Sequence, residues 1–197
     1  APTKAGYTAT PAKVTQADFQ SDLDTFAANT NDGDGQRAFT IVYTSAGQQN
    51  AVITYKDATT GATLTTQTLS GDPDAEIPFA TAATIAGYVD KGYVLVEDGT
   101  VAAAGAVFDT DLTTDQHYTV TLKHLIDDPA VPEAGSDLYD LTHKTYTVTV
   151  NAQSPDGTAV TPVEAMQNLA YTRTASTDHV TNVVTYGDWT STATYTT

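Results

Sequence analysis

Histidine, serine and carboxylate side chains are the groups in this sequence that could perform catalysis or bind a metal ion. The histidines are His117, His124, His143 and His179. His117 and His124 lie seven residues apart in one predicted strand, so they face opposite sides of that strand. Zinc needs ligands that converge on one point. We therefore expect histidines that are scattered over the surface rather than a zinc site.

No motif in the sequence indicates serine or carboxylate catalysis. The chain lacks the Gly-x-Ser-x-Gly sequence that exposes a nucleophilic serine at a sharp turn, and most of its serines fall in predicted turns. Glycosidases use two carboxylates that face each other across a cleft. Among 24 acidic residues, however, some pair is close in any fold. We therefore predict that the protein is not an enzyme.

Two acidic loops contain the short oxygen-bearing side chains that Ca²⁺ prefers. The candidate ligands are Asn31, Asp32 and Asp34 in the first loop and Asp109, Asp111 and Asp115 in the second. Neither loop has the twelve-residue spacing, ending in Glu, of an EF-hand. The sequence thus favours ordinary acidic loops, and the three residues of the first loop are kept as candidate Ca²⁺ ligands. No other cofactor is expected.

The charge of the chain restricts its partners. Its 197 residues include 8 basic and 24 acidic side chains, which give a net charge of −16. Such a charge repels phosphate backbones, so nucleic acid is not expected as a partner. No apolar run approaches the roughly 18 residues of a membrane-spanning helix, so membrane insertion is not expected either. Cysteine is absent, which excludes disulfides and thiolate metal sites.

Two segments carry helical signals. Thr15 can cap the first helix, and the acidic Asp18 suits its positive end. Apolar side chains then recur with the spacing of one helical face, at Phe19, Leu23, Phe26 and Ala27. A second, shorter helix is predicted over residues 79–86.

Alternating apolar and polar residues predict strands along most of the chain. In the first part these are residues 6–9, 37–43, 51–55, 62–69 and 116–124. In the second part they are residues 145–150, 158–163, 168–174, 178–186 and 190–197. The segment between them combines Pro, Gly and acids, which is typical of a domain boundary. The predicted fold is α+β, with domains over residues 1–126 and 137–197 and a linker over residues 127–136.

The aromatic residues are mainly tyrosines, with 11 Tyr, 5 Phe and 1 Trp. Tyrosine suits both half-buried strands and contacts with sugars or proteins, because it joins a flat apolar ring to a polar tip. Packing is favoured here for Tyr55, Tyr118 and Tyr146. Trp189 is expected to fill the core of the second domain. The sequence does not identify the residues that contact a ligand.

A series of short motifs runs from residue 51 to residue 124. Its residues are Tyr55, Asp57, Gly61, Gly71, Gly87, Tyr88, Glu97, Asp98, Gly99, Tyr118, Val120, Leu122 and His124. In this order they resemble the mucin-binding repeat (MucBP) family of Gram-positive surface adhesins. A second series consists of Leu141, Tyr146, Val148, Tyr171, Arg173, Thr177, Asp178, Val180, Gly187 and Trp189. It resembles the B2-like module that follows the first module in these adhesins.

This resemblance implies two tandem elongated modules. The first would be a β-grasp (ubiquitin-like) sheet packed on one main helix, and the second a related, more β-rich module. The implied protein is an extracellular repeat on a bacterial cell surface, anchored to the cell wall as part of a larger chain. The start at Ala1, without Met or a secretory leader, fits a piece of a longer secreted protein.

The function implied by the resemblance is weak, multivalent binding to mucin glycoproteins or their glycans, with other repeats of the same chain as neighbours. Two alternatives stay open. One is an immunoglobulin-binding module, and the other is a structural spacer in the stalk of an adhesin.

Overall fold

The computed structural model describes residues 1–13, 15–19, 40–149, 153–158 and 166–191. Two compact units are present, one of residues 1–85 and 95–122 and the other of residues 86–94 and 123–197. Helices and several β-sheets occur together, which confirms the predicted α+β class. The predicted domain limits, and the linker over residues 127–136, stay a prediction.

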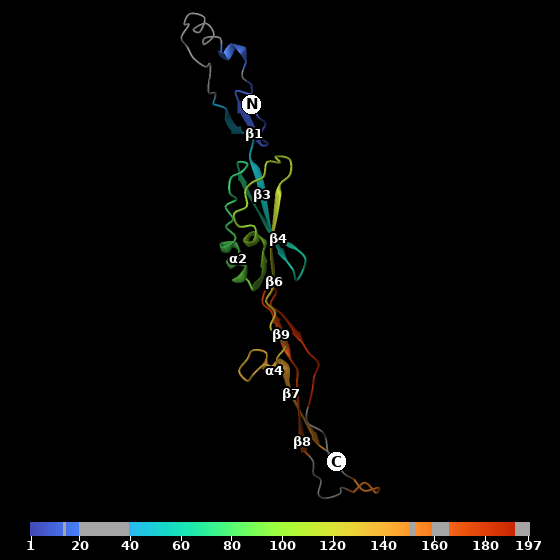
Figure 1. Cartoon of the computed structure of the whole chain (residues 1–197). Helices are drawn as coiled ribbons and strands as arrows, with labels where there is room; N and C mark the ends of the chain where they lie inside the picture. The colour runs from blue at the N-terminus through green and yellow to red at the C-terminus, as the bar shows by residue number, and fades with distance from the viewer. Residues whose placement is uncertain (14, 20–39, 150–152, 159–165, 192–197) are drawn as a thin grey trace, which may run out of the picture. The chain divides into compact units, whose positions relative to one another are not determined.

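The largest sheet has four strands in the order β4-β3-β6-β5 (Figure 1). These strands are β3 (Gln49–Asp57), β4 (Thr63–Gly71), β5 (Tyr93–Asp98) and β6 (Gln116–His124). β3 and β4 form an antiparallel hairpin, whereas β3 and β6 run parallel. Parallel neighbours need a crossover connection, and this one contains helix α2 (Ala82–Val89), which lies beside the sheet in Figure 1. The strands β3, β4 and β6 were expected from the sequence, whereas β5 was not among the predicted strands.

Alternate residues of β3 form the core of this sheet. Ala51, Ile53 and Tyr55 are fully buried, because successive side chains of a strand point to opposite faces. β6 supplies Val120 and Leu122, which are also fully buried, and Tyr55 pairs with Val120 in the parallel register. Burial of one large apolar side chain contributes about 1.5–3 kcal/mol to folding. The predicted packing of Tyr55 is confirmed.

A buried aspartate closes the β3–β4 hairpin. The Asp57 carboxylate accepts hydrogen bonds from the N–H of Thr59 at 2.8 Å and from Thr60 Oγ1 at 2.6 Å. Gly61 follows with a φ of +78°, a left-handed conformation that glycine adopts without steric cost. The turn is therefore fixed by a carboxylate whose burial is compensated by hydrogen bonds.

A second apolar cluster surrounds the buried ring of Phe108, which packs with Ala51 and Ile77. Phe79 and Tyr118 border this cluster, and their ring centroids lie 4.8 Å apart in an edge-to-face arrangement. The predicted packing of Tyr118 is thus confirmed. Phe79 lies outside α2, which begins at Ala82 and not at the predicted residue 79.

The N-terminal segment contains a small sheet and one helical turn. Strand β1 (Tyr7–Thr10) pairs antiparallel with β2 (Val42–Ser45). The Asp18 carboxylate accepts hydrogen bonds from the N–H of Thr15 at 2.6 Å and from its hydroxyl at 2.9 Å, at the start of a 3₁₀ helix, η1 (Gln16–Phe19). The rest of the predicted helix lies outside the described residues.

The second unit is built from two-stranded ribbons. Its elements are α4 (Tyr139–Thr142), β7 (His143–Thr149), β8 (Met166–Thr172), β9 (Ala175–Asp178) and β10 (Val183–Tyr186). β7 pairs with β8, and β9 with β10, both antiparallel. The single strand predicted over residues 178–186 is wrong. Asn182, with a φ of 59°, lies in the turn that joins β9 to β10.

The first half of the predicted linker lies along β9. The N–H of Asp127 donates to the carbonyl of Thr177 at 3.0 Å. Ala130 and Ala175 exchange two backbone hydrogen bonds of 3.2 and 2.8 Å. This part of the Pro-rich segment therefore has a defined position within the second unit.

We predict that Gly71→Ala destabilises the protein. A Cβ at this position, the end of β4, would collide with the buried Phe108 ring, and overpacking of this kind costs about 1–3 kcal/mol. Chemical denaturation followed by circular dichroism measures the change. Gly87→Ala in α2 is the matched control, because no described atom lies within 4 Å of its added Cβ. That substitution should stabilise the helix by about 0.4–1 kcal/mol. Equal effects of both would contradict the packing.

Candidate functional site

Carboxylates are the commonest charged groups in the chain, and they are the ligands that Ca²⁺ prefers. Within the described ranges, no three His, Cys, Asp or Glu side chains are arranged to hold a metal ion. The candidate Ca²⁺ ligands Asn31, Asp32 and Asp34 lie outside those ranges. In the second loop, Asp109 accepts a hydrogen bond from the Gln49 amide at 2.7 Å, and Asp115 accepts one from the Asn50 amide at 3.2 Å. These two carboxylates thus bind different protein donors.

The histidines are not all at the surface, contrary to the expectation. His117 is exposed, whereas His124, on the opposite face of β6, is buried. Nδ1 of His124 lies 2.7 Å from Oδ2 of Asp178, and the Tyr93 ring packs edge-on against the imidazole at 5.3 Å. The expected surface position is wrong for His124, because a carboxylate distant in the sequence compensates for its burial.

Asp178 also closes the turn between β9 and β10. Its Oδ1 accepts hydrogen bonds from the N–H groups of Val180 at 2.9 Å and Thr181 at 3.3 Å. The hydrogen bond from His124, followed by those from the turn, lowers the pKa of the Asp178 carboxyl to about 2. Both carboxylate oxygens therefore hold structural partners, which indicates that this His–Asp pair organises the fold.

We predict that Asp178→Asn lowers the melting temperature in a pH-dependent way. The folded carboxyl has a pKa of about 2, below the ordinary value of 3.8. Its stabilisation is therefore complete above the ordinary value and is lost as the pH falls towards the folded value. Thermal unfolding between about pH 7 and pH 2 should show a difference from wild type that shrinks below about pH 4.

The matched control for this prediction is Asp188→Asn, which removes the same charge from an exposed position. It should leave the melting temperature nearly unchanged, since substitutions at exposed positions usually alter stability by about 0.5 kcal/mol or less. The same pH profile for both variants would contradict the structural role of Asp178.

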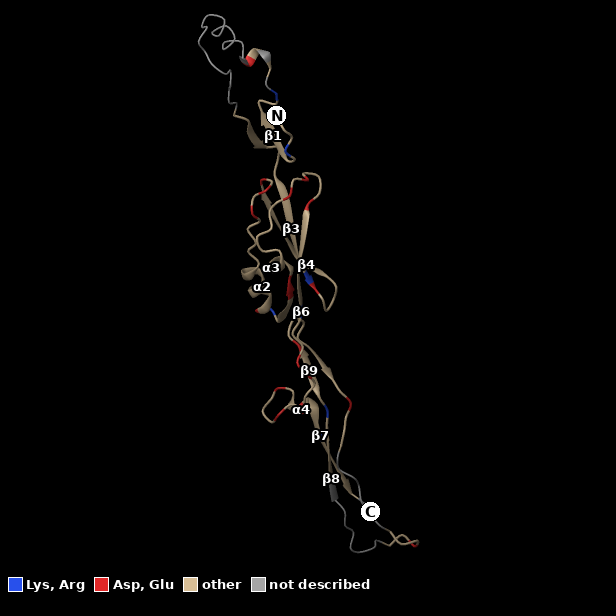
Figure 2. Ribbon diagram, viewed as in Figure 1, with Lys and Arg blue, Asp and Glu red and all other residues tan. Residues whose placement is uncertain are grey.

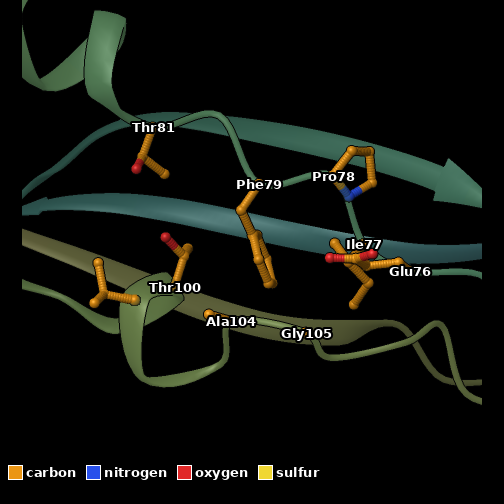
Figure 3. Close-up of a pocket in the computed structure, with 9 residues that line it drawn as sticks. Glu76, Ile77, Pro78, Phe79, Thr81, Thr100, Ala104 and Gly105 are labelled. Carbon is orange, nitrogen blue, oxygen red and sulfur yellow. The ribbon is translucent and has the colours of Figure 1, made fainter.

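A groove lies between the chain that follows β4 and the short helix α3 (Gly99–Ala102), as Figure 3 shows. Its volume is about 380 Å³, and it is lined by Glu76, Ile77, Pro78, Phe79, Thr81, Thr100, Val101, Ala104 and Gly105. In Figure 3, Glu76 lies at one end and Thr81 and Thr100 lie towards the other. Most of the lining between them is apolar.

Asp98 fixes the threonine end of this groove. Its carboxylate accepts hydrogen bonds from Thr81 Oγ1 at 2.6 Å, and from Thr100 Oγ1 at 2.6 Å and its N–H at 3.0 Å. Burial acts to raise the pKa of Asp98, but these hydrogen bonds outweigh it and lower the pKa. Because both hydroxyl protons are directed at Asp98, the groove offers mainly apolar surface to a ligand.

A second hollow, of about 240 Å³, lies in the second unit and is lined by Lys144, Tyr146, Tyr171 and Trp189. The strand register explains their common position. Lys144 pairs with Tyr171 across β7 and β8, and paired residues project on the same side of a sheet. Tyr146 lies two residues further along β7, so it shares this face. Arg173 follows the end of β8, and its guanidinium lies over the Trp189 ring. These five residues, including Arg173, are named the Trp189 surface below.

Trp189 reaches this face through a third segment of chain. Thr190 and Thr172 exchange backbone hydrogen bonds of 2.8 and 2.9 Å, which sets Trp189 beside Arg173. Cζ of Arg173 lies 4.7 Å from the centroid of the Trp189 ring, and Nζ of Lys144 lies 5.8 Å from it. Both are distances at which a cation is attracted to an aromatic ring.

The rings of this surface are accessible to solvent. Tyr146 is 58% exposed and Trp189 is 38% exposed. The Tyr146 and Tyr171 ring centroids lie 5.9 Å apart in an edge-to-face contact. The predicted packing of Tyr146 and the predicted core position of Trp189 are therefore wrong, because a two-stranded ribbon has too little apolar area to bury such rings.

A signal for this surface is present in the sequence. A cation and an aromatic residue stand two positions apart in β7, as Lys144-x-Tyr146, and again at the end of β8, as Tyr171-x-Arg173. In extended backbone, that spacing puts both side chains on one face. Whether the two faces coincide depends on the register of β7 against β8, and the spacing within either strand does not contain this information.

The chain is similar to known proteins in sequence and in structure. A family model described as a mucin binding domain matches residues 49–124, and one described as a Muc B2-like domain matches residues 139–197. The type 2 repeat of the mucus binding protein MUB from Lactobacillus reuteri is similar in structure, with 34% sequence identity and a TM-score of 0.50, over 72% of this chain and 74% of that chain. The crystal structure of Mub-RV is similar with 32% identity and a TM-score of 0.55, over 73% of each chain. Comparison with curated proteins finds no match.

The chain therefore belongs to the mucin-binding repeat family, which confirms the resemblance of its motifs. The groove falls within the match to the mucin binding domain, and the Trp189 surface falls within the match to the Muc B2-like domain. In the described part of the chain, no helix is long and apolar enough to cross a membrane.

Proposed function

We propose that this chain is one repeat of an extracellular adhesin that attaches to mucin glycoproteins or their glycans. Membership of the mucin-binding repeat family supports mucin as the target. The Trp189 surface supports a glycan as the part of mucin that is bound. Exposed aromatic rings can cover the apolar face of a sugar. Lys144 and Arg173 add hydrogen-bond donors beside those rings, which suit the oxygen atoms of a glycan.

The contact of a single repeat is weak in this proposal. A site that binds a small sugar tightly has convergent polar groups within an enclosed cavity. The Trp189 surface instead is a hollow of about 240 Å³ between partly exposed side chains. Repeats joined in one chain make each later contact intramolecular, which raises avidity by about 10²–10⁴-fold. Attachment then depends on several repeats together.

The proposal extends to the organisation of the repeat. We take the first module as a β-grasp domain and the second as a related module, with other repeats of the same cell-wall-anchored chain as neighbours. The hairpin of β3 and β4, followed by the parallel pairing of β3 with β6, supports this topology. Nothing among the described residues favours immunoglobulin binding or a pure spacer role.

We predict that chains of one, two and four repeats bind immobilised mucin with steeply increasing apparent affinity. The reason is the intramolecular character of each additional contact. Surface plasmon resonance at equal repeat concentration measures the effect, and enzymatically deglycosylated mucin is the control that separates glycan from protein targets. Equal affinity for the three chains would contradict multivalency. Absence of binding by all three would contradict mucin attachment itself.

A further inference from the structure

The cations of the Trp189 surface are concentrated there in an otherwise acidic part of the chain. Of the 8 Lys and Arg residues, only Lys144 and Arg173 follow Lys123 in the sequence. Both belong to the Trp189 surface. Acidic residues are far more numerous and are spread along the chain (Figure 2). The only two basic side chains after residue 123 thus share one face with three aromatic rings.

Aromatic rings, rather than carboxylates, hold both cations. Cζ of Arg173 lies 3.9 Å from the centroid of the Tyr186 ring, on top of its contact with Trp189. Nε of Arg173 donates to the carbonyl of Leu141 at 3.0 Å, which fixes the direction of the guanidinium. No ion pair with a carboxylate joins Lys144 or Arg173 among the described residues. In the described part of the chain, no carboxylate therefore neutralises the positive charge of either side chain.

We propose that the Trp189 surface binds an acidic sugar, that is, a sugar that carries a carboxylate or sulfate group. This inference rests on the proposed attachment to mucin glycans and names the chemistry of the site. Lys144 contacts the anionic group, while Tyr146 and Trp189 cover the apolar face of the sugar ring. Arg173 positions Trp189 and adds positive charge. Charge-assisted hydrogen bonds to the anion are stronger than those to neutral hydroxyls, so acidic sugars are preferred over neutral ones.

The net charge of −16 does not prevent this contact. Salt screens exposed charges beyond about 8 Å at physiological ionic strength, so most carboxylates of the chain act weakly on a bound anion. Lys144 contacts the anion directly and is not screened in this way. An exposed ionic contact of this kind contributes modestly, in agreement with weak binding by one repeat.

Trp189 is itself a reporter of the site, because the chain contains 1 Trp. A change in tryptophan fluorescence on addition of a sugar therefore arises at this surface. The whole chain is titrated with 3′-sialyllactose, with 6-sulfo-N-acetylglucosamine, and with lactose as the neutral probe. We expect a saturable change with at least one acidic probe, and binding of lactose about two- to fivefold weaker, the ratio expected when an exposed ionic contact is lost. The acidic probe that binds more tightly identifies the anion. No saturable change, or equal binding of all three probes, would overturn the proposal.

The substitution Lys144→Gln removes the positive charge that is proposed to contact the anion and keeps most of the side-chain length. It should weaken binding of the acidic probes about two- to fivefold and leave lactose unchanged, since only the exposed ionic contact is lost. Lys123→Gln on β6 is the matched control and should have no effect. Tyr146→Ala should weaken all probes, and circular dichroism checks that both variants are folded. Wild-type binding of the acidic probes by Lys144→Gln would overturn the assignment.

The mucin assay keeps this inference separate from the proposed function. A wild-type chain that binds mucin but neither acidic probe overturns the acidic-sugar site alone. A chain that binds an acidic probe with the expected dependence on Lys144, but does not bind mucin in any number of repeats, overturns the proposed attachment alone.

Discussion

The parallel pairing of β3 with β6 is the constraint on which the first unit depends. Its register joins residues 51–57 to residues 116–122, so two segments distant in the sequence share one buried face. Closing such a long connection costs chain entropy, and the fully buried Ile53, Tyr55 and Leu122 offset that cost. Both walls of the groove belong to the segment that connects β3 to β6, so the pairing of these two strands also positions the groove.

The ribbons of the second unit bury little apolar surface. Hydrogen bonds between polar groups therefore contribute a larger share of the stability of this unit than of that of the first. Thr142 is fully buried and donates its hydroxyl to the Leu138 carbonyl at 2.8 Å, and the His124–Asp178 pair fixes the turn after β9. Because so little apolar surface is available to cover them, the rings of the Trp189 surface stay exposed and accessible to a ligand.

Local features of this protein could be predicted from the sequence, and features set by distant contacts could not. The predicted strand over residues 116–124 coincides with β6 because alternation with a period of two is visible in any short window. His124, at the end of β6, is buried beside the carboxylate of Asp178, at the end of β9. Trp189 is exposed because the β7–β8 register gathers its neighbours on an open face. Neither outcome is determined by the residues that flank these side chains.

The pairing of β3 with β6 also has a mechanical consequence. The chain enters β3 at Gln49 and leaves β6 at His124, and in a parallel pair these two points lie at opposite ends. A pull along the backbone therefore shears all seven residue pairs at once instead of separating them one after another. Forced unfolding is governed by the unfolding rate. Because all seven pairs must break together, the sheet unfolds slowly under tension and keeps its length when the chain is pulled.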